Sequence, residues 1–261
     1  MTFQDALGML PALICRLPHL PLVLLLATVG CAGSGGSGTE TGNPLVRGKV
    51  SYAGVSSLPE QYGVRQSATI ATVDRAWLDL GRASVSRAGG CGLAPGDDVA
   101  LPALGIGDHA AGAHNFTAYE AQAAKYCSFG LPFELASDAG AAPEDFTGHS
   151  LLLEGTLADG TAFSLASSQA PTLELEAPAE AFELDQSQPD VLVTFDFGAW
   201  LSSIDFSAAK ESGGRIVIDD ASNTELLQRL EMKLASGVAL YRDRDGDGAL
   251  DAEPELLARG H

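Results

Sequence analysis

The sequence predicts a mainly β fold, an antiparallel β-sandwich with an amphipathic helix and an acidic loop towards its C-terminal end. Between residues 46 and 197, short apolar runs are broken by glycine, proline and aspartate. Several runs alternate apolar with polar residues, as Thr172–Glu176 does, which is typical of strands with one buried and one wet face. Many short strands at close spacing favour an antiparallel sandwich.

The expected strands follow one another along this part of the chain. They are residues 47–53, 68–73, 76–85, 129–135, 150–157, 161–166, 172–176 and 191–197. Asp159-Gly160 lies between two of them and predicts a type I′ hairpin turn, because both residue types tolerate positive φ angles. Residues 95–124 are rich in alanine and glycine without a firm period, and we expect long loops there.

A helical pattern follows at residues 222–236. Ser222 and Glu225 have the spacing of a capping box, in which two side chains satisfy free backbone donors. One helical face then carries Leu226, Leu227, Leu230 and Leu234. A shorter helical segment is expected at residues 199–204, with Trp200 in the core.

The first thirty residues predict a targeting segment. Arg16 precedes an apolar run at residues 20–29, which suits a signal peptide and is shorter than the roughly twenty apolar residues that span a bilayer. The sequence Ala-Thr-Val-Gly-Cys at residues 27–31 resembles the lipobox of bacterial lipoproteins. The resemblance implies cleavage before Cys31 and lipid, including palmitate, on that cysteine. Cleavage by an ordinary signal peptidase is the alternative, and translation starts at Met1 or Met9.

Residues 31–45 are rich in glycine and serine and predict a flexible tether. With its closing residues 39–44, this segment is similar to the opening of uncharacterised lipoproteins from myxobacteria and their relatives. Ala32, and not aspartate, follows the cysteine, which in such lipoproteins implies passage to the outer membrane. We therefore expect a lipid-anchored protein of the outer membrane that faces the periplasm or the cell surface.

Composition limits the size of the fold and the kind of partner. Removal of residues 1–30 leaves about 230 residues, enough for one large or two small domains with a core. We expect one β domain over residues 46–241 and a loop with a C-terminal tail over 242–261; two β modules divided at 177–180 are the alternative. A net charge of −19 argues against a nucleic acid partner and suits solubility and divalent cations.

Two cysteines remain in the expected folded part, Cys91 and Cys127. An even pair in an oxidising compartment predicts a disulfide bond. A metal-binding or catalytic role is the alternative, although the sequence contains no C-x-x-C motif.

One motif carries chemistry of its own, an EF-hand-like calcium loop that begins at Asp243. Its spacing places oxygen ligands at alternate positions, and Gly248 at position 6 permits the sharp turn. Position 12 is Pro254, where a bidentate glutamate is usual, so a neighbouring glutamate or a water would complete the site. We therefore expect weak calcium binding and a structural role, in which the cation holds the loop as a clip. The alternative is a solvated acidic turn that binds no cation. The candidate ligands are Asp243, Asp245, Asp247, the carbonyl of Ala249, Asp251 and Glu255.

The remaining sequence patterns give no positive evidence for catalysis. The sequence contains no G-x-S-x-G elbow, no H-E-x-x-H and no P-loop lysine motif. We expect a structural or partner-binding envelope protein and no enzyme. The alternative is a protein that binds a carbohydrate or a transition metal, and a hydrolase comes third. A deep pocket lined by aromatic residues, or by His109, His114 and His149, would favour the binding protein.

Overall fold

The computed structural model describes residues 44–56, 71–87, 98–110 and 115–261, which belong to one compact unit. The predicted signal, lipobox and most of the tether lie outside the described residues. Within the described ranges the unit is mainly β, as predicted, and its strands join in one sheet of fourteen strands. None of its described helices has the length and apolar character needed to cross a membrane.

The elements run in the following order. The strands are β1 (Leu45–Val55), β2 (Ala71–Arg87), β3 (Val99–Asp108), β4 (Asn115–Gln122), β5 (Ala124–Pro132), β6 (Leu151–Leu157), β7 (Ala162–Ser167), β8 (Thr172–Glu176), β9 (Phe182–Leu184), β10 (Val191–Asp196), β11 (Glu211–Ser212), β12 (Arg215–Ile218), β13 (Val238–Arg242) and β14 (Leu256–Arg259). The α-helices are α1 (Phe197–Ser202) and α2 (Thr224–Glu231), and short 3₁₀ turns occupy Glu144–Phe146, Phe206–Ala208 and Ala235–Gly237.

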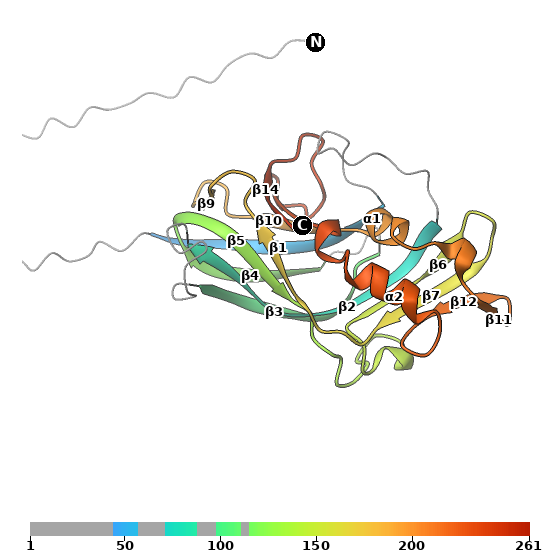
Figure 1. Cartoon of the computed structure of the whole chain (residues 1–261). Coiled ribbons are helices and arrows are strands. Elements are labelled where there is room, and N and C mark those ends of the chain that lie inside the picture. Colours follow the sequence, from blue (N-terminus) through green and yellow to red (C-terminus); the bar gives the residue numbers. More distant parts are fainter. Residues whose placement is uncertain (1–43, 57–70, 88–97, 111–114) are drawn as a thin grey trace, which may run out of the picture. The chain divides into compact units, whose positions relative to one another are not determined.

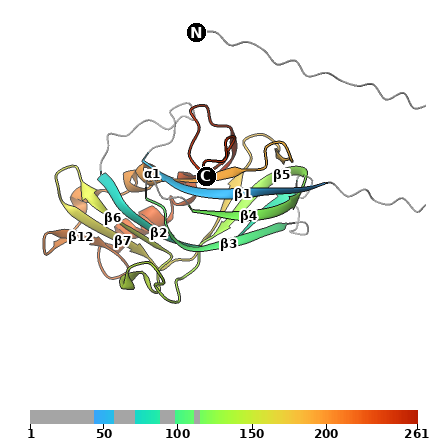
Figure 2. The same ribbon diagram turned by 180° about the vertical axis from the view of Figure 1, so that it is seen from behind.

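Strand β2 is the branch point of the sheet. One edge of β2 pairs with β3, while the other pairs first with β6 and then with β5. From β5 the sheet continues through β8, β14, β13, β10 and β1 to β4, and from β6 it continues through β7 and β12 to β11. The first branch curls until β4 lies beside β3 (Figure 1 and Figure 2). Large apolar side chains from both branches form one core cluster.

The expectation of an antiparallel sandwich is wrong, because not all of the strand pairs are antiparallel. Strands β1 and β10 are parallel, and so are β12 and β7, so the sheet is mixed. It is also one curled sheet and not two stacked ones. Both parallel pairs join strands that are distant in sequence, and such pairing leaves no local pattern in the sequence.

Several expected elements differ from those observed. Residues 68–73 and 76–85 were expected as two strands; residues 71–73 and 76–85 form parts of the single strand β2, and 68–70 lie outside the described residues. The expected strand at 172–176 coincides with β8. Residues 95–124 contain strands β3 and β4, so the expectation of long loops there is wrong. The alanines and glycines of β3 have low β propensity, and pairing with β2 outweighs it. The β6–β7 hairpin is present, but Gly160 alone of its turn pair has positive φ, so the turn is not type I′.

The expected helix at 222–236 is shorter than predicted, and two strands follow it in the chain. Helix α2 buries the predicted leucine face, but Asn223 is its N-cap, with a left-handed φ of 55° and no capping bond from its side chain. That side chain instead donates to the carbonyls of Lys210 and Val217, so the capping box is wrong. Trp200 on α1 is fully buried in the core, as predicted.

Candidate metal centre

The predicted metal loop connects the antiparallel neighbours β13 and β14. Arg242 ends β13, and its backbone N–H donates to the Glu255 carbonyl at 2.9 Å, which closes the base of the loop. Asp243 follows directly and is 2% exposed, whereas Asp245 and Asp247 are exposed. The loop therefore begins on a buried carboxylate and carries two more at its surface.

Three carboxylates meet in this loop. One oxygen each from Asp243, Asp245 and Asp247 lies within 4.8 Å of the others. The Asp243 carboxylate accepts N–H bonds from Gly246 at 2.9 Å and from Gly248 at 3.1 Å. Both glycines have positive φ, 71° and 73°, a conformation that favours glycine and wraps the chain around Asp243.

Burial makes the charge of Asp243 costly, although the nearby Lys49 ammonium favours the charged carboxylate. Burial raises the pKa of its carboxyl group, the N–H bonds from Gly248 and Gly246 oppose this rise, and the negative charge of Asp247 adds to it. A divalent cation among the three carboxylates would offset both the desolvation and the repulsion.

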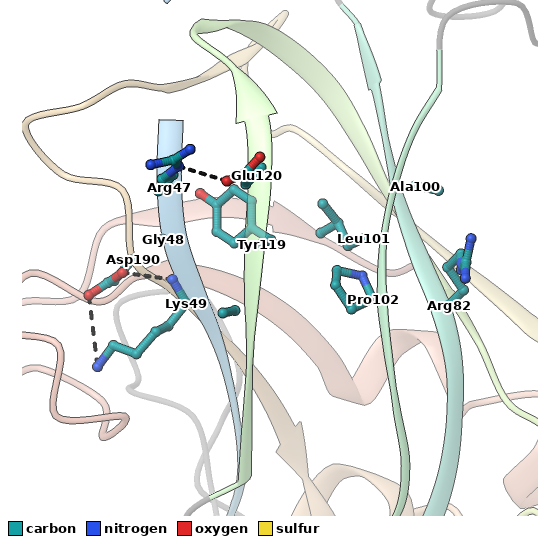
Figure 3. Close-up of a pocket in the computed structure, with 11 residues that line it drawn as sticks. Arg47, Gly48, Lys49, Arg82, Ala100, Leu101, Pro102, Tyr119, Glu120 and Asp190 are labelled. Atoms are coloured by element: carbon teal, nitrogen blue, oxygen red, sulfur yellow. Dashed lines mark hydrogen bonds and ion pairs between the residues drawn. The ribbon is translucent and has the colours of Figure 1, made fainter. Parts of the chain in front are cut away.

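Two strands hold the loop from the side. The Asp243 N–H donates to the carbonyl of Asp190, which immediately precedes β10, at 3.1 Å. On β1, the Lys49 backbone N–H donates to the Asp190 carboxylate at 2.7 Å, and the Lys49 ammonium donates to the Gly246 carbonyl at 2.7 Å. Figure 3 shows Lys49 and Asp190 together. Sequence reasoning missed both residues, because they are far from the loop in sequence and belong to no motif.

Asp251 and Glu255, the later carboxylates of the predicted ligand set, are not in the group of three. The Glu255 carboxylate instead lies 3.7 Å from the guanidinium of Arg242 and 3.2 Å from that of Arg244. Ala249 is exposed, and its carbonyl stays a predicted ligand. One buried carboxylate oxygen of Asp251 has no hydrogen-bond partner among the described residues. The aspartates at positions 1, 3 and 5 of the motif therefore form the acidic group, and Glu255 closes the loop through ion pairs.

The histidines are not gathered with other metal ligands in the described part of the chain. His109 is fully buried at the end of β3 between the rings of Tyr52 and Phe195, and His149 lies before β6. His114 lies outside the described residues. Among the residues described, the group of acidic, histidine or cysteine side chains close enough to share a cation is the aspartate triad Asp243, Asp245 and Asp247.

Cys127 lies on β5 beside the end of β2. Its Sγ is 3.5 Å from the Ser86 carbonyl oxygen and 3.6 Å from that of Arg87. Cys91 follows Arg87 closely in sequence but lies outside the described residues. The Cys91–Cys127 bond stays a prediction, and the position of Cys127 is compatible with it.

The fold and the loop define a mainly β protein with a curled mixed sheet and a candidate site for a hard cation. No family model and no curated protein matches the chain. Among solved structures, MbnP from Methylosinus trichosporium matches with a TM-score of 0.37 and 10% sequence identity. The match covers 66% of this chain and 83% of that chain, and at this level it assigns neither fold nor function.

Proposed function

We propose that this chain is a non-enzymatic, lipid-anchored envelope protein whose β13–β14 loop is held by calcium. The observation that carries the calcium site is the convergence of three carboxylate oxygens within 4.8 Å around the buried Asp243. Hard oxygen ligands suit Ca²⁺ and Mg²⁺, and calcium tolerates the irregular geometry of an incomplete loop better than magnesium does.

The bound cation would act as a clip and not as a sensor. The loop is bonded to Asp190, which immediately precedes β10, through the Asp243 N–H, and to Lys49 on β1 through the Gly246 carbonyl. An ordered loop therefore joins the end of β13 to two further strands. The arginine pairing of Glu255 leaves the site without the bidentate ligand of a tight EF-hand. We therefore expect a calcium Kd of about 0.1–1 mM, which is the range of extracellular calcium-binding modules.

Calcium titration of the purified protein tests the clip. We expect the melting temperature to rise by about 3–6 °C when calcium exceeds Kd about tenfold, because binding to the folded state alone stabilises it. The double substitution Asp245→Ala, Asp247→Ala should abolish this rise and the heat of binding. Its matched control is Glu180→Ala, Glu225→Ala, which removes two exposed carboxylates outside the loop and should respond as the wild type does.

A second pair of variants separates ligands from loop closure. Asp243→Asn should weaken calcium binding at least about a hundredfold, since it removes the buried charge at the centre of the loop. Glu255→Gln should change the calcium Kd less than about threefold, because its partners are the two arginines. A calcium response that survives loss of Asp245 and Asp247 would contradict the clip.

The anchor rests on the lipobox-like residues before Cys31 and is tested independently of calcium. Cys31→Ser should move the protein from the membrane pellet to the soluble envelope fraction, because the residue that would carry the lipid is lost. Mass spectrometry of the N-terminal peptide should find diacylglyceryl and acyl groups on Cys31 in the wild type. An unchanged membrane fraction in the variant would rule out the lipid anchor.

A further inference from the structure

A hollow of about 690 Å³ lies where the curled sheet fails to close (Figure 3). Strand β4 pairs with β1 and strand β3 pairs with β2, but within the described residues β3 and β4 share no ladder with each other. The two strands are joined near their connection, where the Asn115 side chain donates to the Asp108 carbonyl at 2.6 Å. Away from that point the hollow separates residues 100–102 of β3 from 118–120 of β4.

Among the described residues, the edges of β3 and β4 that face each other have no partner strand. On each strand, alternate backbone N–H and C=O groups point away from the paired neighbour and towards the other strand. Such an edge is a template for another extended chain, and strand addition is a recurrent form of peptide recognition. A segment laid between β3 and β4 would pair with both edges and complete the curl.

The walls of the hollow combine an apolar floor with a charged rim. Leu101 and Tyr119, 2% and 3% exposed, fill the floor from β3 and β4. On the rim, Arg47 pairs with Glu120 at 2.7 Å, a pair that is exposed and weak enough to exchange for another partner. Arg82 forms no ion pair in the described part of the chain.

The charge of the rim selects the occupant. The lining contains three basic residues, Arg47, Lys49 and Arg82, against the acidic residues Glu120 and Asp190, so it is net positive on a chain of net charge −19. A smaller hollow lined by Leu45, Arg47 and Gln186 adjoins it along β1, which gives the surface an elongated form. An elongated, basic surface between two strand edges fits an extended acidic chain.

We propose that the β3–β4 hollow binds an extended, acidic segment of a partner protein by strand addition. This inference deepens the partner-binding role under the proposed function, but it depends neither on calcium nor on the lipid anchor. The backbone edges would supply the affinity, while Arg82 and Arg47 would select for carboxylates on the added strand.

The probe is a capped, fluorescein-labelled peptide of about ten residues that alternates valine with threonine and carries two glutamates. We expect saturable binding to the full-length protein by fluorescence anisotropy, weakened by salt. Hydrogen exchange should show new protection in β3 and β4. Lysines in place of the glutamates, or N-methylation of alternate peptide amides, should raise Kd at least about tenfold.

Two protein variants locate the site. Arg82→Glu should raise Kd for the acidic peptide at least about fivefold and lower it for the lysine peptide. The matched control Arg229→Glu, an exposed arginine on α2, should change neither value.

Equal binding of both peptides, or protection elsewhere in the chain, would overturn the proposal. So would a peptide-free dimer with protected β4 amides, since the occupant would then be a second copy. The double variant Asp245→Ala, Asp247→Ala should bind the peptide with the Kd of the wild type. This titration distinguishes a failure of the peptide site from a failure of the calcium site.

Discussion

His109 is a buried imidazole at the end of β3, enclosed by aromatic rings. The ring centroids of Phe195 and Tyr52 lie 5.3 and 6.3 Å from that of His109. Burial lowers the pKa of His109 to about 4, against the opposing effect of the negative charge of Asp108. The folded protein therefore keeps this histidine neutral at pH values where an unfolded chain would protonate it.

Acid should destabilise the fold through His109. Because its pKa is near 4 in the folded state and about 6.5 in the unfolded chain, the unfolded state binds more protons between these values. Stability should fall as pH falls through this window, by about 2 kcal/mol between pH 7 and pH 5. Urea unfolding at both pH values measures the loss, and His109→Gln should remove that part of it. The exposed control His261→Gln should keep the full pH dependence; equal slopes in all three proteins would contradict this assignment.

Residue by residue, the sequence located the centre of the metal loop but not its surroundings. The spacing of Asp243, Asp245 and Asp247 is a local pattern, and the structure brings their carboxylates together. Lys49 and Asp190 hold the loop from strands far away in the chain. Glu255 was expected as a ligand, whereas its carboxylate pairs with Arg242 and Arg244. The guanidinium of Arg242 is held in turn by the carbonyls of Glu183 and Gln188, which are far away in the sequence.

Among the elements, helix α1 is fixed to the turn after α2 by one tryptophan. Trp200 is fully buried, and its indole N–H donates to the carbonyl of Leu234 at 2.9 Å. A side chain on Gly237 would collide with the Trp200 ring, with only 2.4 Å available. A glycine and an indole hydrogen bond thus permit the close approach of the two segments.

Trp200→Phe should lower the free energy of unfolding by about 1–3 kcal/mol, because the Leu234 carbonyl loses its buried donor. Trp77→Phe at a half-buried tryptophan should cost less, since the indole N–H of Trp77 is buried without a hydrogen-bond partner among the described residues. Urea denaturation of the two variants at neutral pH measures the difference. Equal losses would show that ring volume, and not the hydrogen bond, determines the cost.

At the scale of the whole molecule, the predicted Cys91–Cys127 bond would fasten the segment between β2 and β3 to β5. Both Cys91→Ser and Cys127→Ser should lower stability by about 3–4 kcal/mol, and the double variant should add no further loss. The wild type under reducing conditions should match the variants. Thiol titration of the unfolded, unreduced wild type should find neither cysteine free, and two free thiols would contradict the bond.

Features that depend on neighbouring residues were predictable before the fold was known. Alternating apolar residues predicted several strands, the leucine spacing predicted a helix within residues 222–236, and the aspartate spacing predicted where carboxylates converge. Each is a short-range pattern set by the periods of strand, helix and turn.

Features that depend on partners elsewhere in the fold emerged only in the structure. It set the parallel pairing of β1 with β10, the strand character of β3 and β4, and the ion pairs of Glu255. It also left the edges of β3 and β4 facing each other across a hollow. For the strands, the reason is that pairing with a partner strand outweighs weak local preferences, and the residues of one strand do not encode which strand its partner is.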